Sequence, residues 1–268
     1  MMKETLWNNI TQLREKSPLV HNITNYVVMN NTANALLAAG ASPIMAHAPN
    51  EMEAMMNICQ VLVVNIGTLD DYWVTSMKKA AQQANQLNKP WVLDPVGAGA
   101  TPYRDEVLSD LLSLHPTIIR GNASEIMALA KHNITSTKGV DSSAESNEAI
   151  AAAHILDEKY QACICISGAT DIIISRDKEI HLLNGNELMT KITGMGCSAT
   201  ALVAAFSVIV DDRAEAVTSA MAMLGVAGEI AAQESKGPGS LQVNILDKLY
   251  SLTEKEFMST LKLEVKRG

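Results

Sequence analysis

Residues 117–131 run TIIRGNASEIMALAK, and this stretch decides the fold class. It opens with an apolar run that ends at Arg120, turns through Gly121 and Asn122, and continues from Ser124 with apolar residues at helical spacing. A short apolar run closed by turn residues is typical of a buried strand, and a longer periodic segment is typical of a helix. The stretch therefore predicts one βα unit, with a strand over residues 117–120 and a helix over residues 124–131.

The same unit recurs along the chain. Further strands are predicted over residues 42–45, 61–66, 91–94 and 162–167. Further helices are predicted over residues 27–39, 71–87, 145–158, 198–210, 213–233 and 245–252. This alternation is typical of an α/β fold with a largely parallel sheet, and the last helices predict a helical layer in the C-terminal third. Residues 171–175 and 179–183 are predicted to pair as an antiparallel hairpin at one edge of the sheet.

The chain has 268 residues, which is within the range of a single α/β domain around one sheet. It contains no Pro/Ser/Gly-rich linker, no low-complexity tract and no internal repeat. Residues 133–146 are polar and contain Gly and Ser, so we expect a surface loop there and not a domain boundary. The whole chain, residues 1–268, is thus predicted to be one domain.

The composition excludes several classes of partner. The formal net charge is −8 and no stretch is rich in Lys or Arg, so nucleic acid and anionic membranes are poor partners. The first residues lack the apolar core of a secretory signal, which predicts a cytoplasmic protein. The strongly apolar stretch 199–210 is too short to cross a bilayer and predicts a buried helix. The four cysteines form no Cys-x-x-Cys pair, so neither zinc nor a disulfide framework is indicated.

The segment Thr193-Gly194-Met195-Gly196-Cys197-Ser198 precedes the apolar helix predicted over residues 198–210. Glycines at a helix start expose backbone amides where the helix dipole already favours an anion, so the segment is a candidate anion site. The alternative is a tight turn. No Lys-Ser/Thr follows, which excludes a Walker A loop, and no third glycine arrives at the spacing of a dinucleotide fingerprint. Gly97-Ala98-Gly99 fails the same two tests.

Two acidic residues follow neighbouring predicted strands. Asp94 ends the strand over residues 91–94, and Glu125 lies in the first turn of the helix after residues 117–120. Ligands of open α/β sheets bind at the carboxyl ends of the strands. Taken singly, Asp94 is explained as a turn former and Glu125 as a helix-start acid. Together, beside an anion site, they predict a magnesium site for a nucleotide, because Mg²⁺ is usually held by one or two carboxylates plus waters and phosphates.

Four segments together resemble hydroxyethylthiazole kinase, a branch of the ribokinase-like superfamily. They are Val20-His21-Asn22-Ile23-Thr24-Asn25, Leu93-Asp94-Pro95-Val96-Gly97-Ala98-Gly99, Arg120-Gly121-Asn122-Ala123-Ser124-Glu125 and Gly194-Met195-Gly196-Cys197. The resemblance runs from about His21 to Gly239 in the order of the family. It implies a three-layer α/β/α fold, ATP as co-substrate with Mg²⁺, and a homotrimer with active sites near the subunit interfaces.

The resemblance also implies roles for single residues. Asn25 and Met45 would line the thiazole pocket, with Gly194 under the reacting alcohol. Arg120 and Ser167 would contact ATP, while Asp94 and Glu125, with Asn122 beside them, would hold or position the metal. Each role has a structural alternative: Met45 as core, Ser167 as a turn residue, Arg120 as a surface cation. His21 is expected to anchor a loop through hydrogen bonds and not to act as a base.

Cys197 stands where many ribokinase-like sugar kinases have an aspartate that is their presumed general base, and a cysteine is typical of the thiazole-kinase branch. Three roles remain open for Cys197. It is an inert small residue, a weak proton acceptor whose thiol pKa is lowered by the helix N-terminus, or a nucleophile, which direct in-line transfer makes unnecessary. With Gly194 and Gly196 it completes the predicted catalytic group.

The resemblance thus implies ATP-dependent phosphorylation of the alcohol of 4-methyl-5-(2-hydroxyethyl)thiazole, a step of thiamine salvage. One alternative is a kinase for a related alcohol, such as a pyrimidine or pyridoxal-like one. Another is a protein that binds thiazole or thiamine on the same fold without turnover. The combination of Asp94, Glu125, Gly194 and Gly196 favours turnover, because a binding protein would not require them together.

Overall fold

The computed structural model describes residues 2–133, 145–176 and 178–267. Its strands form one nine-stranded sheet with the order β2-β1-β3-β4-β5-β6-β7-β8-β9. The strands are β1 Leu19–Ile23, β2 Ser42–Ile44, β3 Val61–Asn65, β4 Trp91–Asp94, β5 Ile118–Asn122, β6 Cys163–Ser167, β7 Asp171–Ser175, β8 Lys178–Leu182 and β9 Leu263–Arg267. The predicted α/β fold class is confirmed.

The sheet is parallel from β2 through β6 and antiparallel beyond. In the parallel part, the register pairs Asn65 with Asp94 and Asn122 with Ser167, so that polar residues end neighbouring strands at one edge of the sheet. The predicted hairpin of β7 and β8 is confirmed. Its predicted place at the edge is wrong, because β9 pairs with β8 on the outside.

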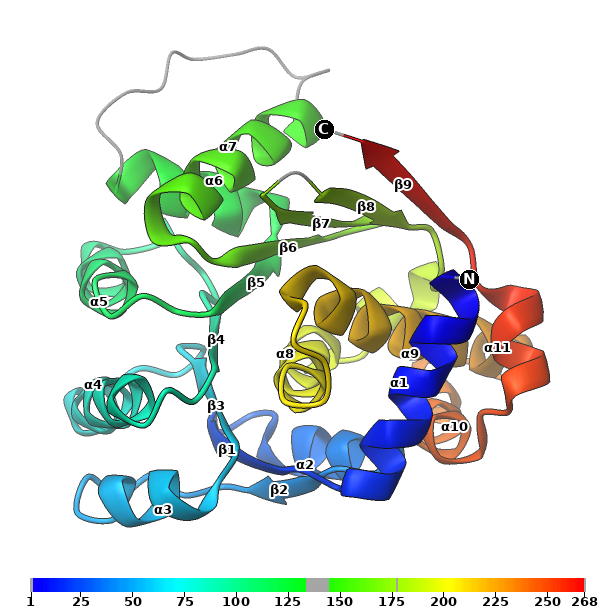
Figure 1. Ribbon diagram of the computed structural model, residues 1–268, viewed down its shortest axis with the longest axis horizontal. Coiled ribbons are helices and arrows are strands. Elements are labelled where there is room, and N and C mark those ends of the chain that lie inside the picture. Colours follow the sequence, from blue (N-terminus) through cyan, green and yellow to red (C-terminus); the bar gives the residue numbers. More distant parts are fainter. Residues whose placement is uncertain (1, 134–144, 177, 268) are drawn as a thin grey trace.

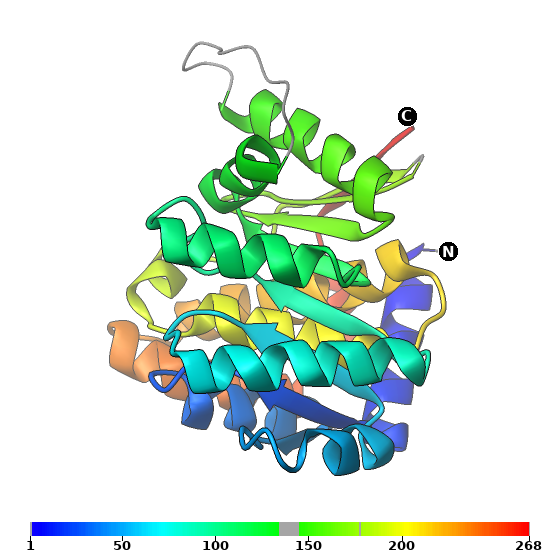
Figure 2. The same ribbon diagram turned by 90° about the vertical axis from the view of Figure 1, so that its left-hand side faces the viewer.

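Helices cover both faces of the sheet, which confirms the three-layer α/β/α fold (Figure 1). One face carries α3 Met52–Ile58, α4 Asp71–Gln86, α5 Pro102–Leu112, α6 Ala123–Asn133 and α7 Glu145–Tyr160. Figure 2 shows these helices side by side in front of the strands. The other face carries α1 Met2–Lys16, α2 Met29–Ala39, α8 Met195–Phe206, α9 Arg213–Gln233, α10 Pro238–Ser251 and α11 Glu254–Thr260, and the short 3-10 helix η2 Glu187–Lys191 precedes α8.

Two apolar clusters, one on each face of the sheet, form the core. The strands alternate between them: Val61 and Val63 of β3 belong to one cluster, and Leu62 and Val64 to the other. Helix α9 is long and apolar enough to cross a membrane by length and composition alone, but 83% of its apolar stretch is buried inside the protein. It is therefore a core helix, as is α8, whose residues from Ser198 to Phe206 are all buried.

Several elements were not predicted or begin elsewhere than predicted. Strand β1 was missed because His21 and Asn22 interrupt its apolar run, although both side chains are fully buried. The polar edge strand β9 and the helices α1, α3, α5 and α11 were also missed. Helix α10 starts at Pro238 and not at residue 245, because proline is well suited to the first turn of a helix.

Helix α8 starts at Met195, three residues before the predicted start, and ends at Phe206 and not at residue 210. The predicted loop over residues 133–146 lies largely outside the described residues. Its first residue ends α6, and its last two residues begin α7.

Candidate active site

The first turn of α8 contains the predicted glycine segment. Gly194 caps the helix with φ +82°, a left-handed conformation that favours glycine, and a Cβ there would lie 2.7 Å from Val28 Cγ1. The first helical hydrogen bond runs from Ser198 N to Gly194 O at 2.8 Å. The amides of Met195, Gly196 and Cys197 therefore have no acceptor within the helix, which leaves three donors at its positive end. This geometry is that of an anion site.

Arg120, near the carboxyl end of β5, reaches over this turn. Its guanidinium lies so close to Gly196 that a Cβ there would be 2.6 Å from Arg120 Nη1. The Nε atom of Arg120 is buried and has no hydrogen-bond partner among the described residues. A partly buried cation with an unpaired, buried Nε beside free helix amides fits the binding of a phosphate.

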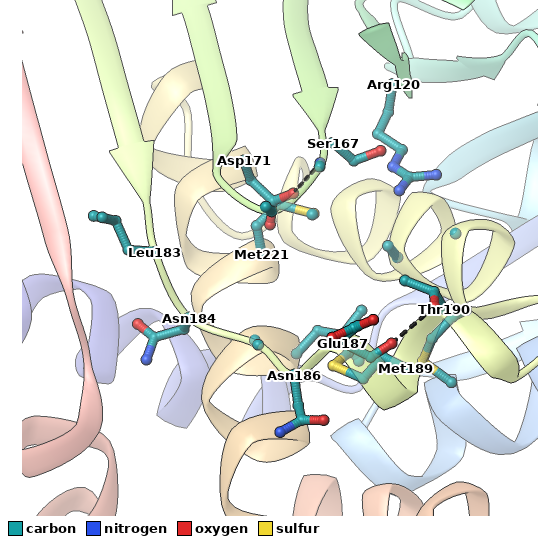
Figure 3. A pocket seen from close by; sticks show the side chains of 18 residues that line it. Arg120, Ser167, Asp171, Leu183, Asn184, Asn186, Glu187, Met189, Thr190 and Met221 are labelled. Atoms are coloured by element: carbon teal, nitrogen blue, oxygen red, sulfur yellow. Dashed lines mark hydrogen bonds between the residues drawn. The ribbon is translucent and has the colours of Figure 1, made fainter. Parts of the chain in front are cut away.

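A cavity of about 610 Å³ opens beside the same turn. Arg120 and Ser167 lie on one side of it, while Asn186, Glu187, Met189 and Thr190 lie opposite (Figure 3). Its apolar wall includes Met195 of α8 and Met221 and Leu224 of α9. A mainly apolar cavity with a cationic end suits a nucleotide, whose base is apolar on both faces and whose phosphates are charged.

Of the predicted site residues, the structure brings Arg120, Ser167 and Gly196 together in this cavity. Ser167 ends β6 and its hydroxyl donates to Gly121 O at 3.3 Å. Asp171 also lines the cavity and was missed by the sequence analysis. Its Oδ1 accepts the amide of Gly168 at 3.1 Å, and burial raises the pKa of its carboxyl to about 6. The signal available was the acid two residues after Gly168-Ala169, where a carboxylate closes a tight turn.

Asp94 is almost fully buried at the end of β4. Its Oδ2 accepts Asn65 Nδ2 at 2.7 Å and Thr200 Oγ1 at 2.8 Å, while its Oδ1 has no partner among the described residues. Burial raises the pKa of the Asp94 carboxyl to about 6, although Arg120 and the two hydrogen bonds oppose this rise. One oxygen is thus free to meet a cation or its water.

Glu125 is in the first turn of α6, as predicted. Its Oε1 accepts the amide of Gly97 at 3.0 Å and its Oε2 accepts the amide of Asn122 at 2.8 Å. The carboxylate therefore ties together the loops that follow β4 and β5. Asn122 in turn caps α6, since its Oδ1 accepts the Glu125 amide at 2.9 Å. Neither residue lines the cavity.

The carboxylates of Asp94 and Glu125 indicate which kind of metal ion the site would hold. Among the described residues there is no group of three or more His, Cys, Asp or Glu side chains that could hold an ion. Asp94 and Glu125 are near enough for each to act on the charge of the other, since Glu125 contributes to the raised pKa of Asp94. Two carboxylates completed by phosphate and water oxygens fit Mg²⁺. They do not fit zinc, which prefers His and Cys ligands in a closed site.

The predicted acceptor residues lie beside the cavity and not in it. Asn25, just after β1, is 5% exposed, and its Nδ2 is 3.4 Å from Cys197 Sγ. Met45 follows the neighbouring strand β2 and is partly buried. Gly194 and Cys197 also do not line the cavity. The first turn of α8 therefore has two neighbours. Gly196 lines the cavity, and Cys197 contacts Asn25 outside the cavity.

The thiol of Cys197 is kept neutral. Burial, together with the nearby Asp94, raises its pKa to about 11, although hydrogen bonds from Asn65 and Asn25 oppose this. Of the three roles left open for Cys197, the proton acceptor with a lowered thiol pKa is disfavoured, because burial raises that pKa. Cys59, Cys163 and Cys165 are buried free thiols.

His21 is fully buried in β1 and donates from Nε2 to Ala46 O at 2.9 Å, which anchors the segment after β2. Burial lowers the pKa of its imidazole, so it stays neutral. The expected structural role is confirmed.

The order of the strands, the helices on both faces and a helix N-terminus at the carboxyl edge define the ribokinase-like fold. The fold is similar to that of a ribokinase-like superfamily protein from Enterococcus faecalis V583, with a TM-score of 0.68, 12% identity, and coverage of 95% of this chain and 94% of that chain.

A more specific similarity is to hydroxyethylthiazole kinase from Pyrococcus horikoshii OT3, with a TM-score of 0.91, 40% identity, and coverage of 98% and 100% of the two chains. Hydroxyethylthiazole kinase from Syntrophus aciditrophicus is 51% identical over 261 residues, or 97% of each chain. The hydroxyethylthiazole kinase family model matches residues 10–255. The chain belongs to the hydroxyethylthiazole kinase family.

Proposed function

We propose that this chain transfers the γ-phosphoryl group of ATP to the alcohol of 4-methyl-5-(2-hydroxyethyl)thiazole, a salvage step toward thiamine. Membership of the family supports both the reaction and the substrate. The observation that carries the proposal is the shared first turn of α8. Gly196 lies in the cavity under Arg120, and the next residue, Cys197, contacts Asn25. One helix N-terminus thus adjoins both a nucleotide-sized cavity and the predicted alcohol site.

The base of ATP would occupy the apolar part of the cavity near Met221 and Leu224, with the phosphates at the amides of residues 195–197. Arg120 would pair with phosphate oxygens through its unsatisfied guanidinium. Phosphoryl transfer proceeds through a loose transition state, so catalysis depends mainly on position and on neutralising charge. Fixed amides and the partly buried guanidinium of Arg120 supply that neutralisation without reorganising, which makes them the largest contribution expected of the protein.

Asp94 and Glu125 would hold Mg²⁺, directly or through water, with Asn122 beside them. Asp94 has a free Oδ1 for this purpose, and Glu125 fixes the loops on either side. When bound, the metal neutralises charge on the phosphate oxygens. An ionised Asp94 without a bound cation is costly, mainly because it is buried and also because Glu125 is near, as its raised pKa indicates.

The alcohol would attack the γ-phosphorus in line, close to Cys197. Since the thiol is neutral at physiological pH, Cys197 is not a thiolate base or nucleophile in this state. A general base contributes typically about 10² to 10⁴-fold, so turnover without one remains substantial. The alcohol proton would leave late, after most of the bond to phosphorus has formed.

We further propose that the chain is a single cytoplasmic domain that assembles as a homotrimer, with Met45 and Asn25 in a thiazole pocket near the subunit interface. One sheet that includes strands from residue 19 to residue 267 supports a single domain. The exposed apolar side chains of Tyr26 and Val27, directly after Asn25, support a contact with a partner at that place.

Watching ADP form with and without the thiazole alcohol, and identifying the product by mass spectrometry, tests the function. We expect ADP release to depend on the alcohol and one phosphate to appear on it. ADP release that responds only to a pyrimidine or pyridoxal-like alcohol would contradict the substrate assignment. Binding of the thiazole without any ADP formation would indicate a binding protein on the kinase fold.

A further inference from the structure

A buried chain of side-chain hydrogen bonds runs from Asp94 to the alcohol site. Asn65, the last residue of β3, donates from Nδ2 to Asp94 Oδ2 at 2.7 Å. Asn25 donates from Nδ2 to Asn65 Oδ1 at 2.9 Å and lies 3.4 Å from Cys197 Sγ through the same nitrogen. Asn65 is 1% exposed and Asp94 is 2% exposed, so water does not substitute for these bonds.

Asn65 fixes which atoms donate and which accept along this series of hydrogen bonds. The backbone amide of Gly67 donates to Asn65 Oδ1 at 3.0 Å, and a backbone amide only donates. The oxygen of the Asn65 side chain therefore faces Gly67, and its nitrogen faces the carboxylate. Both ends of the Asn65 amide have a partner that accepts only this orientation.

The orientation of Asn25 follows from that of Asn65. Because Asn65 presents an oxygen, Asn25 must present its nitrogen, whose two hydrogens are directed to Asn65 Oδ1 and Cys197 Sγ. Packing does not decide between the two orientations, since the oxygen and the nitrogen of an amide are almost the same size. Gly67 lies against Asn25, where a Cβ would be 2.7 Å from Nδ2, and it confines the amide without distinguishing its ends.

The remaining atom is Asn25 Oδ1. It has no hydrogen-bond partner among the described residues, and it is not one of the enclosed polar atoms left without a partner. It is thus a free acceptor that is not fully enclosed, on an amide whose nitrogen lies 3.4 Å from Cys197 Sγ in the first turn of α8. If the hydroxyl of the alcohol donates its hydrogen to Asn25 Oδ1, the lone pairs of the hydroxyl oxygen face away from Asn25. Those lone pairs are the ones that attack phosphorus.

We propose that Asn65 is a positioning residue that holds the amide oxygen of Asn25 toward the substrate, so that the site selects a hydroxyl donor next to Cys197. The inference rests on the proposed function and adds the basis on which the alcohol is recognised. Asn65 touches neither substrate nor nucleotide. It acts by removing the freedom of Asn25 to turn its amide around.

The test compares two ligands, 4-methyl-5-(2-hydroxyethyl)thiazole and 4-methyl-5-ethylthiazole, which lacks the hydroxyl. Their dissociation constants are measured by calorimetry without ATP or metal. The unmodified protein should bind the alcohol with a dissociation constant about three- to tenfold lower than that of the ethyl compound. This ratio corresponds to one hydrogen bond between neutral groups. Asn65→Leu removes the acceptor that fixes Asn25, and the preference should fall to near unity.

Asn9→Leu is the matched control. Asn9 is also a buried asparagine, 5% exposed, and bonds Glu215 and Ser219 in the contact of α1 with α9. It should lower the melting temperature and leave the ligand preference unchanged. If Asn65→Leu does not yield folded protein, Asn65→Ala removes the same amide without adding bulk and carries the same expectation.

An undiminished preference for the alcohol in folded Asn65→Leu or Asn65→Ala would overturn the proposal, as would an equal loss in Asn9→Leu. Failure of the unmodified protein to bind or phosphorylate the alcohol would instead count against the proposed function. The two failures are therefore distinguishable.

Discussion

At the scale of one residue, Cys197 shows how burial determines the pKa of a side chain. Its thiol lies at a helix N-terminus, where the dipole favours a thiolate, yet the pKa is raised to about 11. The neighbouring carboxylate of Asp94 opposes a second negative charge. An ionisable side chain at this position therefore has its charge decided mainly by Asp94 and by burial.

We predict that Cys197→Asp keeps or raises turnover, because a carboxylate supplies the base that sugar kinases have in this position and is close to cysteine in size. Its pKa should be raised by burial and Asp94, so the gain should appear as pH rises and disappear in acid. Cys197→Ser should be slower but active. The kcat of each variant against pH checks this, and intact-mass measurement should detect no phosphoenzyme. A folded but inactive Cys197→Asp protein, or a trapped phosphocysteine, would overturn it.

Asp94→Asn and Glu125→Gln should each reduce turnover severely at ordinary magnesium concentration. Thiazole binding should remain nearly intact, because both residues act through metal and phosphate and not through the ring. Steady-state kinetics over a range of magnesium concentrations, with the dissociation constant of the thiazole, checks both parts. Near-normal activity and magnesium dependence in either variant would remove that residue from the metal assignment.

Without bound ligands, the ionised carboxylate of Asp94 should lower the free energy of unfolding at neutral and higher pH. The pKa of Asp94 in the folded protein, about 6, lies above the usual aspartate value of 3.8, so the folded protein binds the proton more tightly than the unfolded chain. Protonated Asp94 therefore adds about 3 kcal/mol to the free energy of unfolding, relative to ionised Asp94. This contribution is complete below the pKa of the unfolded chain and is lost as pH rises through the pKa of the folded protein. Asp94→Asn should therefore melt at a higher temperature than the unmodified protein at pH 8, with a difference that shrinks below pH 6.

The measurement is a melting curve at several pH values without ATP or magnesium, since a bound cation favours the ionised carboxylate. Asp110→Asn is the control, because Asp110 is exposed and paired with Lys78 at the surface. Its effect should be small and nearly independent of pH. A lower melting temperature for Asp94→Asn at pH 8 would contradict the prediction.

Single residues also show how far the sequence predicts the site. Chemistry-bearing residues at strand and helix ends, such as Asp94, Glu125 and Gly194, were found because turn residues and neighbouring glycines mark them. Asn65 and Thr200 were not found. Each is one polar residue within an apolar segment, and their importance arises from a hydrogen bond to Asp94 across a long sequence separation. No local pattern encodes such a contact.

At the scale of elements, the first turn of α8 and the end of β5 act as one unit. Arg120 lies so close to Gly196 that a side chain at residue 196 would have to displace the guanidinium. The sequence predicted both elements but placed the start of α8 at residue 198 and not at Met195. The reason is that glycine has a low helix propensity, which hides a helical turn built around it.

We predict that Gly196→Ala resembles Arg120→Ala. A methyl group 2.6 Å from Nη1 must displace the guanidinium, so both variants should raise the KM for ATP more than the KM for the thiazole. Gly239→Ala, at a helical glycine with open space around it, is the control and should change neither constant. A larger effect on the thiazole than on ATP would move Arg120 out of the nucleotide site.

At the scale of the whole molecule, the parallel strands bring residues distant in sequence to one edge of the sheet. The carboxyl ends of β1, β3, β4, β5 and β6 carry Asn25, Asn65, Asp94, Asn122 and Ser167. This convergence could be predicted from the alternation of strands and helices, because parallel strands end at a common edge. The strand order could not, since β1 was hidden by its buried His21 and Asn22.

The same edge carries exposed apolar side chains beside the alcohol site. Tyr26 is 60% exposed and Val27 is 63% exposed, directly after Asn25, although Tyr26 packs on Trp73 with ring centroids 4.3 Å apart. Contiguous exposed apolar side chains, unlike single ones, are a feature of contacts with a partner. Val265 lies in β9, the outermost strand on the side of the sheet away from β1 and β2, and is 52% exposed.

We predict that the protein in dilute solution has about three times its chain mass of 28.8 kDa and that Val27 lies in the contact between subunits. Val27→Glu should lower the mass measured by light scattering and raise the KM for the thiazole in the same variant, because a charge would have to be desolvated in the contact. Val265→Glu, an equivalent change at the far edge, should keep both the mass and the KM. A fully active single chain, or equal behaviour of the two variants, would show that the alcohol site is complete within one subunit.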